Sequence, residues 1–114
     1  MKRMQAILVL AGTVFAPLCQ ANDFPTADRV EFVLECMRDH TGGQFELLNK
    51  CSCTVDRLAE RYKYDEFVEA QTMAKAVTIA GERGSTLRDN EDAQKAAKRY
   101  RASVTEAGRA CFLR

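Results

Sequence analysis

The chain has 114 residues, which is enough for one domain of ordinary size and no more. Its 17 Lys and Arg residues against 16 Asp and Glu residues give a formal net charge of +1, which excludes the strongly basic surface of a typical nucleic-acid-binding protein. Charged residues make up 29% of the chain, with no Trp and only two Pro, a composition typical of a soluble helical domain.

The first 21 residues have the three parts of a secretory signal peptide. Lys2 and Arg3 form the positively charged N-terminal region, and residues 6–15 form the apolar region. In Cys19-Gln20-Ala21 the first and last residues are the small residues that a cleavage site needs. The apolar run is shorter than the roughly 20 residues that a membrane-spanning helix needs. We therefore expect removal of residues 1–21 and a periplasmic or secreted mature protein.

The mature chain, residues 22–114, is expected to form a single helical domain. Without Lys2 and Arg3 it has 15 basic and 16 acidic residues, a net charge of about −1 at neutral pH. Cleavage also removes Cys19, so an even number of cysteines enters an oxidising compartment, which predicts two disulfides. The four remaining cysteines are Cys36, Cys51, Cys53 and Cys111.

Two helices are expected in the first half of the mature chain, after a flexible lead-in over residues 22–27. The first begins with Asp28 as its N-cap and ends near His40, before a Gly-Gly turn. Its apolar stripe consists of Val30, Val33, Leu34 and Met37. The second helix begins within residues 44–47 and ends near Tyr62. Its stripe consists of Leu48, Cys51, Val55, Leu58 and Tyr62.

Two further helices are expected in the second half. The third has Asp65 as N-cap and ends near Gly81, and a polar connector over residues 85–89 follows it. Asn90 then caps a last helix. Its stripe of mostly small residues consists of Ala93, Ala97, Tyr100, Val104, Ala107 and Cys111. No segment alternates with period two, so the predicted fold is all-α: a compact bundle of about four amphipathic helices crosslinked by two disulfides.

The cysteine pattern leaves the pairing open. Cys36 and Cys51 flank the first turn almost symmetrically, and Cys36 and Cys53 do so only slightly less. A bridge there would close a loop of about 15 residues, worth roughly 3 kcal/mol. The apolar stripes instead favour Cys51 with Cys111. In a helix Cys53 lies about 200° from Cys51, so the two are expected to face different neighbours. Pairing between Cys51 and Cys53 is the least expected, because so tight a ring strains a disulfide.

The sequence gives little support for a catalytic site or a metal site. A thiol–disulfide exchange site using Cys51 and Cys53 is an alternative, but it lacks both the usual two intervening residues and a thioredoxin-like strand pattern. His40 is the only histidine, and the cysteines lack zinc-module spacing, so we predict no metal and no cofactor. Glu31, Glu35 and Asp39 form an acidic edge on the first helix, which is interpreted as a solvated face, with binding of a cation or a basic partner as the alternative.

The last helix carries the one candidate docking surface. Its basic residues are interpreted either as a solubilising face or as a docking patch for an acidic periplasmic protein. They are Lys95, Lys98, Arg99 and Arg101.

Three stretches, residues 35–40, 50–53 and 64–70, carry a family resemblance. They resemble small exported cysteine-containing proteins found alongside quinoprotein (PQQ-dependent) alcohol dehydrogenases and their cytochromes c in Gram-negative bacteria. The resemblance implies an accessory role in periplasmic alcohol oxidation and implies no catalytic residue. We therefore expect a non-enzymatic accessory or binding protein with a larger periplasmic partner. The alternatives are the thiol–disulfide protein named above and a secreted inhibitor or immunity-type protein.

Overall fold

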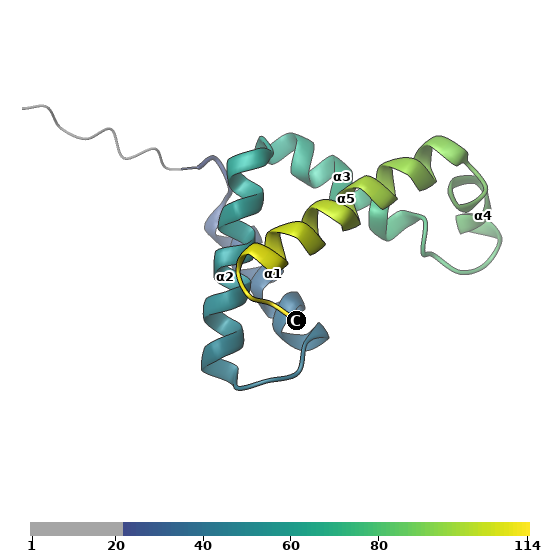
Figure 1. Ribbon diagram of the computed structural model, residues 1–114. Helices are drawn as coiled ribbons and strands as arrows, with labels where there is room; N and C mark the ends of the chain where they lie inside the picture. The colour runs from purple at the N-terminus through teal and green to yellow at the C-terminus, as the bar shows by residue number, and fades with distance from the viewer. Residues whose placement is uncertain (1–21) are drawn as a thin grey trace, which may run out of the picture.

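The computed structural model describes residues 22–114, so the predicted signal peptide lies outside the described part. This part contains five α-helices and no strand, which confirms the all-α prediction but adds one helix to the expected number (Figure 1). The helices are α1 (Thr26–Asp39), α2 (Gln44–Arg61), α3 (Tyr64–Ala76), α4 (Glu82–Arg88) and α5 (Glu91–Ala110). None of the helices between residues 22 and 114 combines the length and apolar character needed to cross a membrane.

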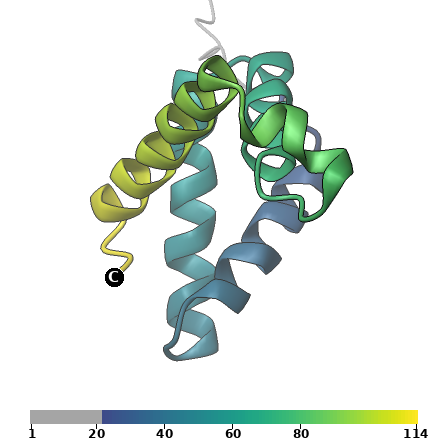
Figure 2. The same ribbon diagram turned by 90° about the vertical axis from the view of Figure 1, so that its right-hand side faces the viewer.

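The helices form two antiparallel pairs that share one core. Helix α1 packs on α2, and α3 packs along α5, while α2 also contacts α5 and so joins the pairs. In Figure 1 the α1–α2 hairpin runs vertically, and α3 and α5 extend from its upper half towards α4. Figure 2 shows that the turn of the hairpin projects below the other helices.

The lead-in to α1 is packed, so the prediction of a flexible segment is wrong. Phe24 is 6% exposed, and its ring centroid lies 4.8 Å from that of Phe67 on α3. This contact lets the helix begin at Thr26, ahead of the predicted N-cap Asp28. The Asp28 carboxylate instead accepts a hydrogen bond of 2.6 Å from the Tyr64 hydroxyl. An aromatic contact across some forty residues thus decides the local structure.

The buried face of α1 also differs from the predicted stripe. Phe32, Val33 and Cys36 are buried, whereas Val30 and Leu34 are exposed. Apolar residues cover more than half of the circumference of α1, so periodicity alone could not select the inner side. The disulfide at Cys36 and the aromatic core around Phe32 fix the rotation of the helix.

The predicted polar connector over residues 85–89 is wrong, because most of it belongs to the short helix α4. Helix α3 ends at Ala76, and Gly81, with φ of 88°, precedes the new helix. Gly84 is buried in the first turn of α4, where its Cα lies against the Ile79 carbonyl. This stretch has few apolar residues, so its sequence did not predict a helix. In the structure Gly84, and not a large apolar residue, makes the close contact with the neighbouring main chain.

Replacing Gly84 with alanine is expected to lower the free energy of unfolding by about 1–3 kcal/mol, the usual range for overpacking. The added Cβ would overlap the main-chain carbonyl of Ile79, which cannot rotate away as a side chain can. Gly43→Ala is the matched control, because nothing lies within 4 Å of its added Cβ. Urea unfolding followed by circular dichroism measures both variants; equal losses would contradict the close contact at Gly84.

Helix α5 agrees with its prediction at the start and along its length. The Asn90 side chain accepts a hydrogen bond of 2.9 Å from the Ala93 amide, as an N-cap does. Ala97 and Ala107 on the stripe are fully buried. Small side chains at these positions let α5 approach the neighbouring helices closely, with Tyr100 between them as the one large residue.

Candidate functional site: a cleft between α1, α3 and α5

Two disulfides hold the frame of the site. Cys36 is bonded to Cys51 and Cys53 to Cys111, with Cα–Cα distances of 5.9 and 5.8 Å. The prediction of two disulfides is therefore confirmed. The symmetry of the hairpin indicated the correct partner for Cys51, and the apolar stripes, which favoured Cys111, indicated the wrong one.

Cys51 and Cys53 face different neighbours, as their spacing on a helix predicts. Cys51 is fully buried and turns towards α1, whereas Cys53 reaches the end of α5. The two near-adjacent sulfurs thus belong to separate bridges and do not form a pair with each other. A thiol–disulfide site that cycles between Cys51 and Cys53 has no such pair in this structure.

A cleft of about 500 Å³ lies between α1, α3 and α5. Its volume falls in the range of small-molecule and side-chain binding pockets. The inner part of the lining is mainly apolar and the outer part is charged. The residues that line it are Phe32, Glu35, Cys36, Asp39, His40, Thr54, Gln71, Ala74, Lys75, Thr78, Tyr100, Arg101, Val104, Thr105 and Leu113.

The polar groups deep in the cleft are neutral. The buried Thr54 hydroxyl donates a hydrogen bond of 2.8 Å to the Lys50 carbonyl of its own helix. Burial raises the pKa of the Tyr100 phenol, and a hydrogen bond with Gln71 opposes this shift only in part. Tyr100 is therefore protonated at neutral pH. The inner cleft thus offers an apolar surface without a formal charge.

Charged residues from three helices surround the opening. Lys75 of α3 donates a hydrogen bond of 2.9 Å to the Glu35 carboxylate of α1. Arg101 of α5 reaches across to the Ala74 carbonyl, 3.3 Å away. His40 donates from Nδ1 to the Cys36 carbonyl at 2.8 Å, which terminates α1 beside the cleft. The opening thus presents charges of both signs around an apolar interior.

The end of α5 completes the lining. The Leu113 amide donates to the Gly108 carbonyl at 2.9 Å and the Phe112 amide to the Arg109 carbonyl at 3.1 Å, which is the Schellman pattern of helix termination. Phe112 takes the left-handed conformation, with φ of 60°, that this motif requires. The turn directs Leu113 back into the cleft.

The four basic residues proposed for docking lie on the exposed part of α5. Arg101 lines the cleft, and Lys98, one turn earlier on α5, is exposed. Lys95 lies 3.8 Å from Glu91, one turn earlier on the same helix. Arg99 lies at the opposite edge, over a second hollow that also includes Tyr62. The structure therefore places Arg101 at the cleft and Arg99 at the other hollow, while Lys98 is exposed one turn before Arg101.

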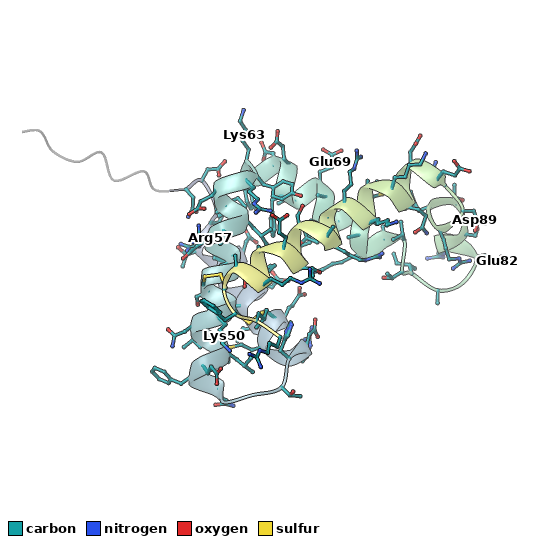
Figure 3. All side chains as sticks on the ribbon, in the orientation of Figure 1. Lys50, Arg57, Lys63, Glu69, Glu82 and Asp89 are labelled. Carbon is teal, nitrogen blue, oxygen red and sulfur yellow. A yellow bond between two sulfur atoms is a disulfide. The ribbon has the colours of Figure 1, made fainter. Side chains whose placement is uncertain are left out.

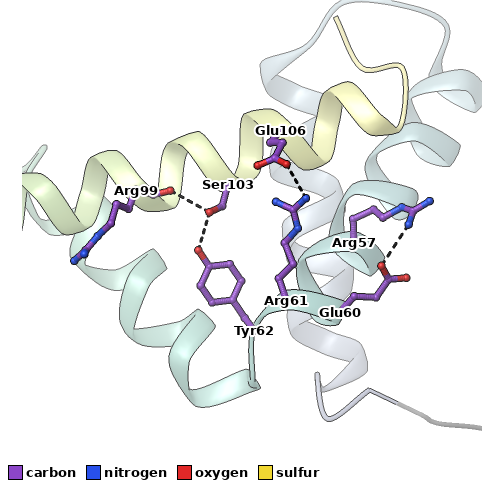
Figure 4. A network of polar contacts seen from close by, with 7 residues as sticks. All are labelled: Arg57, Glu60, Arg61, Tyr62, Arg99, Ser103 and Glu106. Atoms are coloured by element: carbon purple, nitrogen blue, oxygen red, sulfur yellow. Dashed lines mark hydrogen bonds and ion pairs between the residues drawn. The ribbon is translucent and has the colours of Figure 1, made fainter.

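A polar network fixes this opposite edge of α5 (Figure 4). The Tyr62 hydroxyl donates to Ser103 at 2.9 Å, and the Ser103 hydroxyl donates to the Arg99 carbonyl at 3.1 Å. Arg61 donates to the Glu106 carboxylate at 3.0 Å, and this hydrogen bond lowers the pKa of Glu106. The network holds the end of α2 against α5 and leaves the Arg99 guanidinium outside it.

Sequence reasoning did not find the cleft. It identified Tyr100 as a bulky residue on a stripe, but Glu35 and Lys75 lie forty residues apart and no local pattern joins them. Across the described residues, no group of three or more His, Cys, Asp or Glu side chains is arranged to hold a metal ion. Comparison of the chain with protein-family models, curated proteins and solved structures gave no match.

Proposed function

We propose that this protein is a non-enzymatic periplasmic accessory protein that binds an acidic surface of a larger exported protein through α5 and the adjacent cleft. The observation that supports this most is the charge of α5, where basic residues outnumber acidic ones by five to three. The mature chain as a whole has a net charge of about −1, so positive charge is concentrated on this helix. Such a concentration accelerates and orients encounters with an acidic partner.

The cleft adds an apolar centre to the charged surface of α5. Interfaces typically have an apolar centre that is surrounded by polar and charged groups. Here Phe32, Tyr100 and Val104 offer the apolar centre, and Arg101 and Lys75 stand at its opening. An apolar side chain of the partner would enter the cleft while its acidic neighbours meet the cations. The disulfides support this function because they hold the cleft in one shape before binding.

The family resemblance indicates which partners to test first. Small exported proteins of the kind that this chain resembles occur beside quinoprotein alcohol dehydrogenases and their cytochromes c. We therefore propose one of these proteins as the partner.

The double variant Lys98→Glu/Arg101→Glu is expected to weaken binding of the purified dehydrogenase or its cytochrome c by tenfold or more, since it replaces two attractive charges with repulsive ones. Titration calorimetry at low and at high salt measures the effect, and salt is expected to weaken the wild-type complex as well.

Arg57→Glu is the control, and it is compared with the single variant Arg101→Glu because each reverses one positive charge. Arg57 lies on α2 and pairs with Glu60 at 3.4 Å, so its reversal changes the net charge without touching α5 or the cleft (Figures 3 and 4). An equal loss of binding in this control would indicate a general charge effect and contradict the assigned surface. No binding by the wild-type protein to either partner would overturn the proposed identity of the partner.

A further inference from the structure

The outer side of the α1–α2 hairpin exposes an unusual amount of apolar surface. Val30 is 51% exposed, Leu34 62%, Phe45 81% and Leu48 42%. These four residues, here called the hairpin face, account for half of the large exposed apolar side chains in residues 22–114. A groove of about 270 Å³ between the two helices is lined by Val30, Leu34 and Leu48 of this face, with Val33 and Val55 also in its lining.

The hairpin face gathers four exposed large apolar side chains on two neighbouring helices. Soluble monomers rarely expose contiguous apolar patches of more than a few hundred Å², and larger patches usually mark an interface. None of the other helices shields this surface: α1 packs mainly on α2, and the lower half of the hairpin projects away from α3, α4 and α5 (Figure 2). The face also lies apart from the cleft, which is lined by the opposite side of α1.

Two exposed charges of opposite sign lie beside Leu34, and one of them, Arg38, is 3.9 Å from the exposed carboxylate of Asp39 in its own chain. Glu31 and Arg38 precede and follow Leu34 by three and four residues, and both are exposed. At 100° per residue they fall within about 20° of each other, on the same side of Leu34. They are also about 10 Å apart along the helix, too far to pair within one chain.

If two α1 helices cross antiparallel at Leu34, Arg38 of each copy comes level with Glu31 of the other. The rise of 1.5 Å per residue leaves an axial offset of only about 1.5 Å between the opposite charges. A twofold axis repeats this ion pair on both sides of Leu34, as an isologous dimer requires. A parallel arrangement would instead place like charges together.

We propose that the mature protein forms a twofold-symmetric homodimer through the hairpin face, with Leu34 near the axis and two Glu31–Arg38 pairs beside it. This dimer leaves the cleft and the basic side of α5 open, so it does not depend on the function proposed above. It presents two copies of that binding surface to a partner, which strengthens the binding of a partner that can engage both.

Sedimentation velocity of the mature chain over a range of concentrations tests the proposal directly. The wild-type protein is expected to sediment as a dimer, and Leu34→Asp to weaken the dimer by at least a hundredfold, as the loss of a central interface residue does. Val68→Asp on α3 is the control, because Val68 is also apolar and exposed but lies outside the hairpin face. Thermal unfolding verifies that both variants remain folded.

Charge exchange provides the more specific test. Glu31→Arg and Arg38→Glu are each expected to weaken the dimer by roughly tenfold, since each places two like-charge contacts in the interface. The combined variant Glu31→Arg/Arg38→Glu is expected to restore it. A wild-type protein that remains monomeric, a dimer that survives Leu34→Asp, or a combined variant as weak as the single ones would each overturn the proposal.

Discussion

Replacing Phe67 with alanine is expected to lower the free energy of unfolding by about 3–5 kcal/mol, the range for removing a buried aromatic side chain. Phe67 is 2% exposed, and its ring meets four other aromatic rings from different parts of the chain. The centroid distances are 4.8 Å to Phe24, 6.0 Å to Tyr100, 6.2 Å to Phe32 and 6.4 Å to Tyr62. One deletion therefore loosens the lead-in, α1, the end of α2 and α5 together.

Urea unfolding followed by circular dichroism at 222 nm measures this loss. Val68→Ala is the matched control, because Val68 follows Phe67 on α3 but is exposed, and its change is expected to stay within about 0.5 kcal/mol. The near-ultraviolet spectrum should also weaken in Phe67→Ala, since the remaining rings lose their fixed environment. A loss of less than 1 kcal/mol would show that the five rings do not form one core.

The sequence predicted best where a local pattern had only one structural solution. Asn90 followed by acidic residues and a regular four–three spacing of small residues specified the start of α5, its length and its buried side. The Gly-Gly turn after His40 similarly located the α1–α2 hairpin. The hairpin favoured the pairing of Cys36 with Cys51 that the structure has. The apolar stripes favoured Cys111 as the partner of Cys51, so the sequence left the pairing open.

Prediction failed where a distant contact decides between local alternatives. The burial of Phe24 depends on Phe67, more than forty residues away, and the rotation of α1 depends on what lies around Phe32. The cleft is the extreme case. Its ion pair joins Glu35 and Lys75 from two helices whose apposition follows only from the packing of the whole chain.

Removal of the second disulfide, in Cys53→Ala/Cys111→Ala, is expected to lower the free energy of unfolding by about 4 kcal/mol. The bridge spans 58 residues, and chain entropy assigns a loop of this length more stabilisation than the roughly 3 kcal/mol of the 15-residue loop closed by Cys36 and Cys51. For a domain whose total stability is typically 5–15 kcal/mol, this is a large share. Urea unfolding of this variant and of Cys36→Ala/Cys51→Ala, which removes the first disulfide, measures the two losses.

The same variant shows how much of the attachment of α5 to α2 depends on the disulfide and how much on noncovalent contacts. The Arg61–Glu106 pair and the Tyr62–Ser103 hydrogen bond still join the end of α2 to α5, so α5 should keep its protection against hydrogen exchange as far as Glu106. The last turn, which holds Leu113 in the cleft, should lose it, because the bridge at Cys111 fixes that turn to α2. Partner binding should then weaken without any change in charge. Unchanged stability and exchange would mean that packing alone holds the end of α5, and the bridge would no longer explain how the cleft keeps its shape.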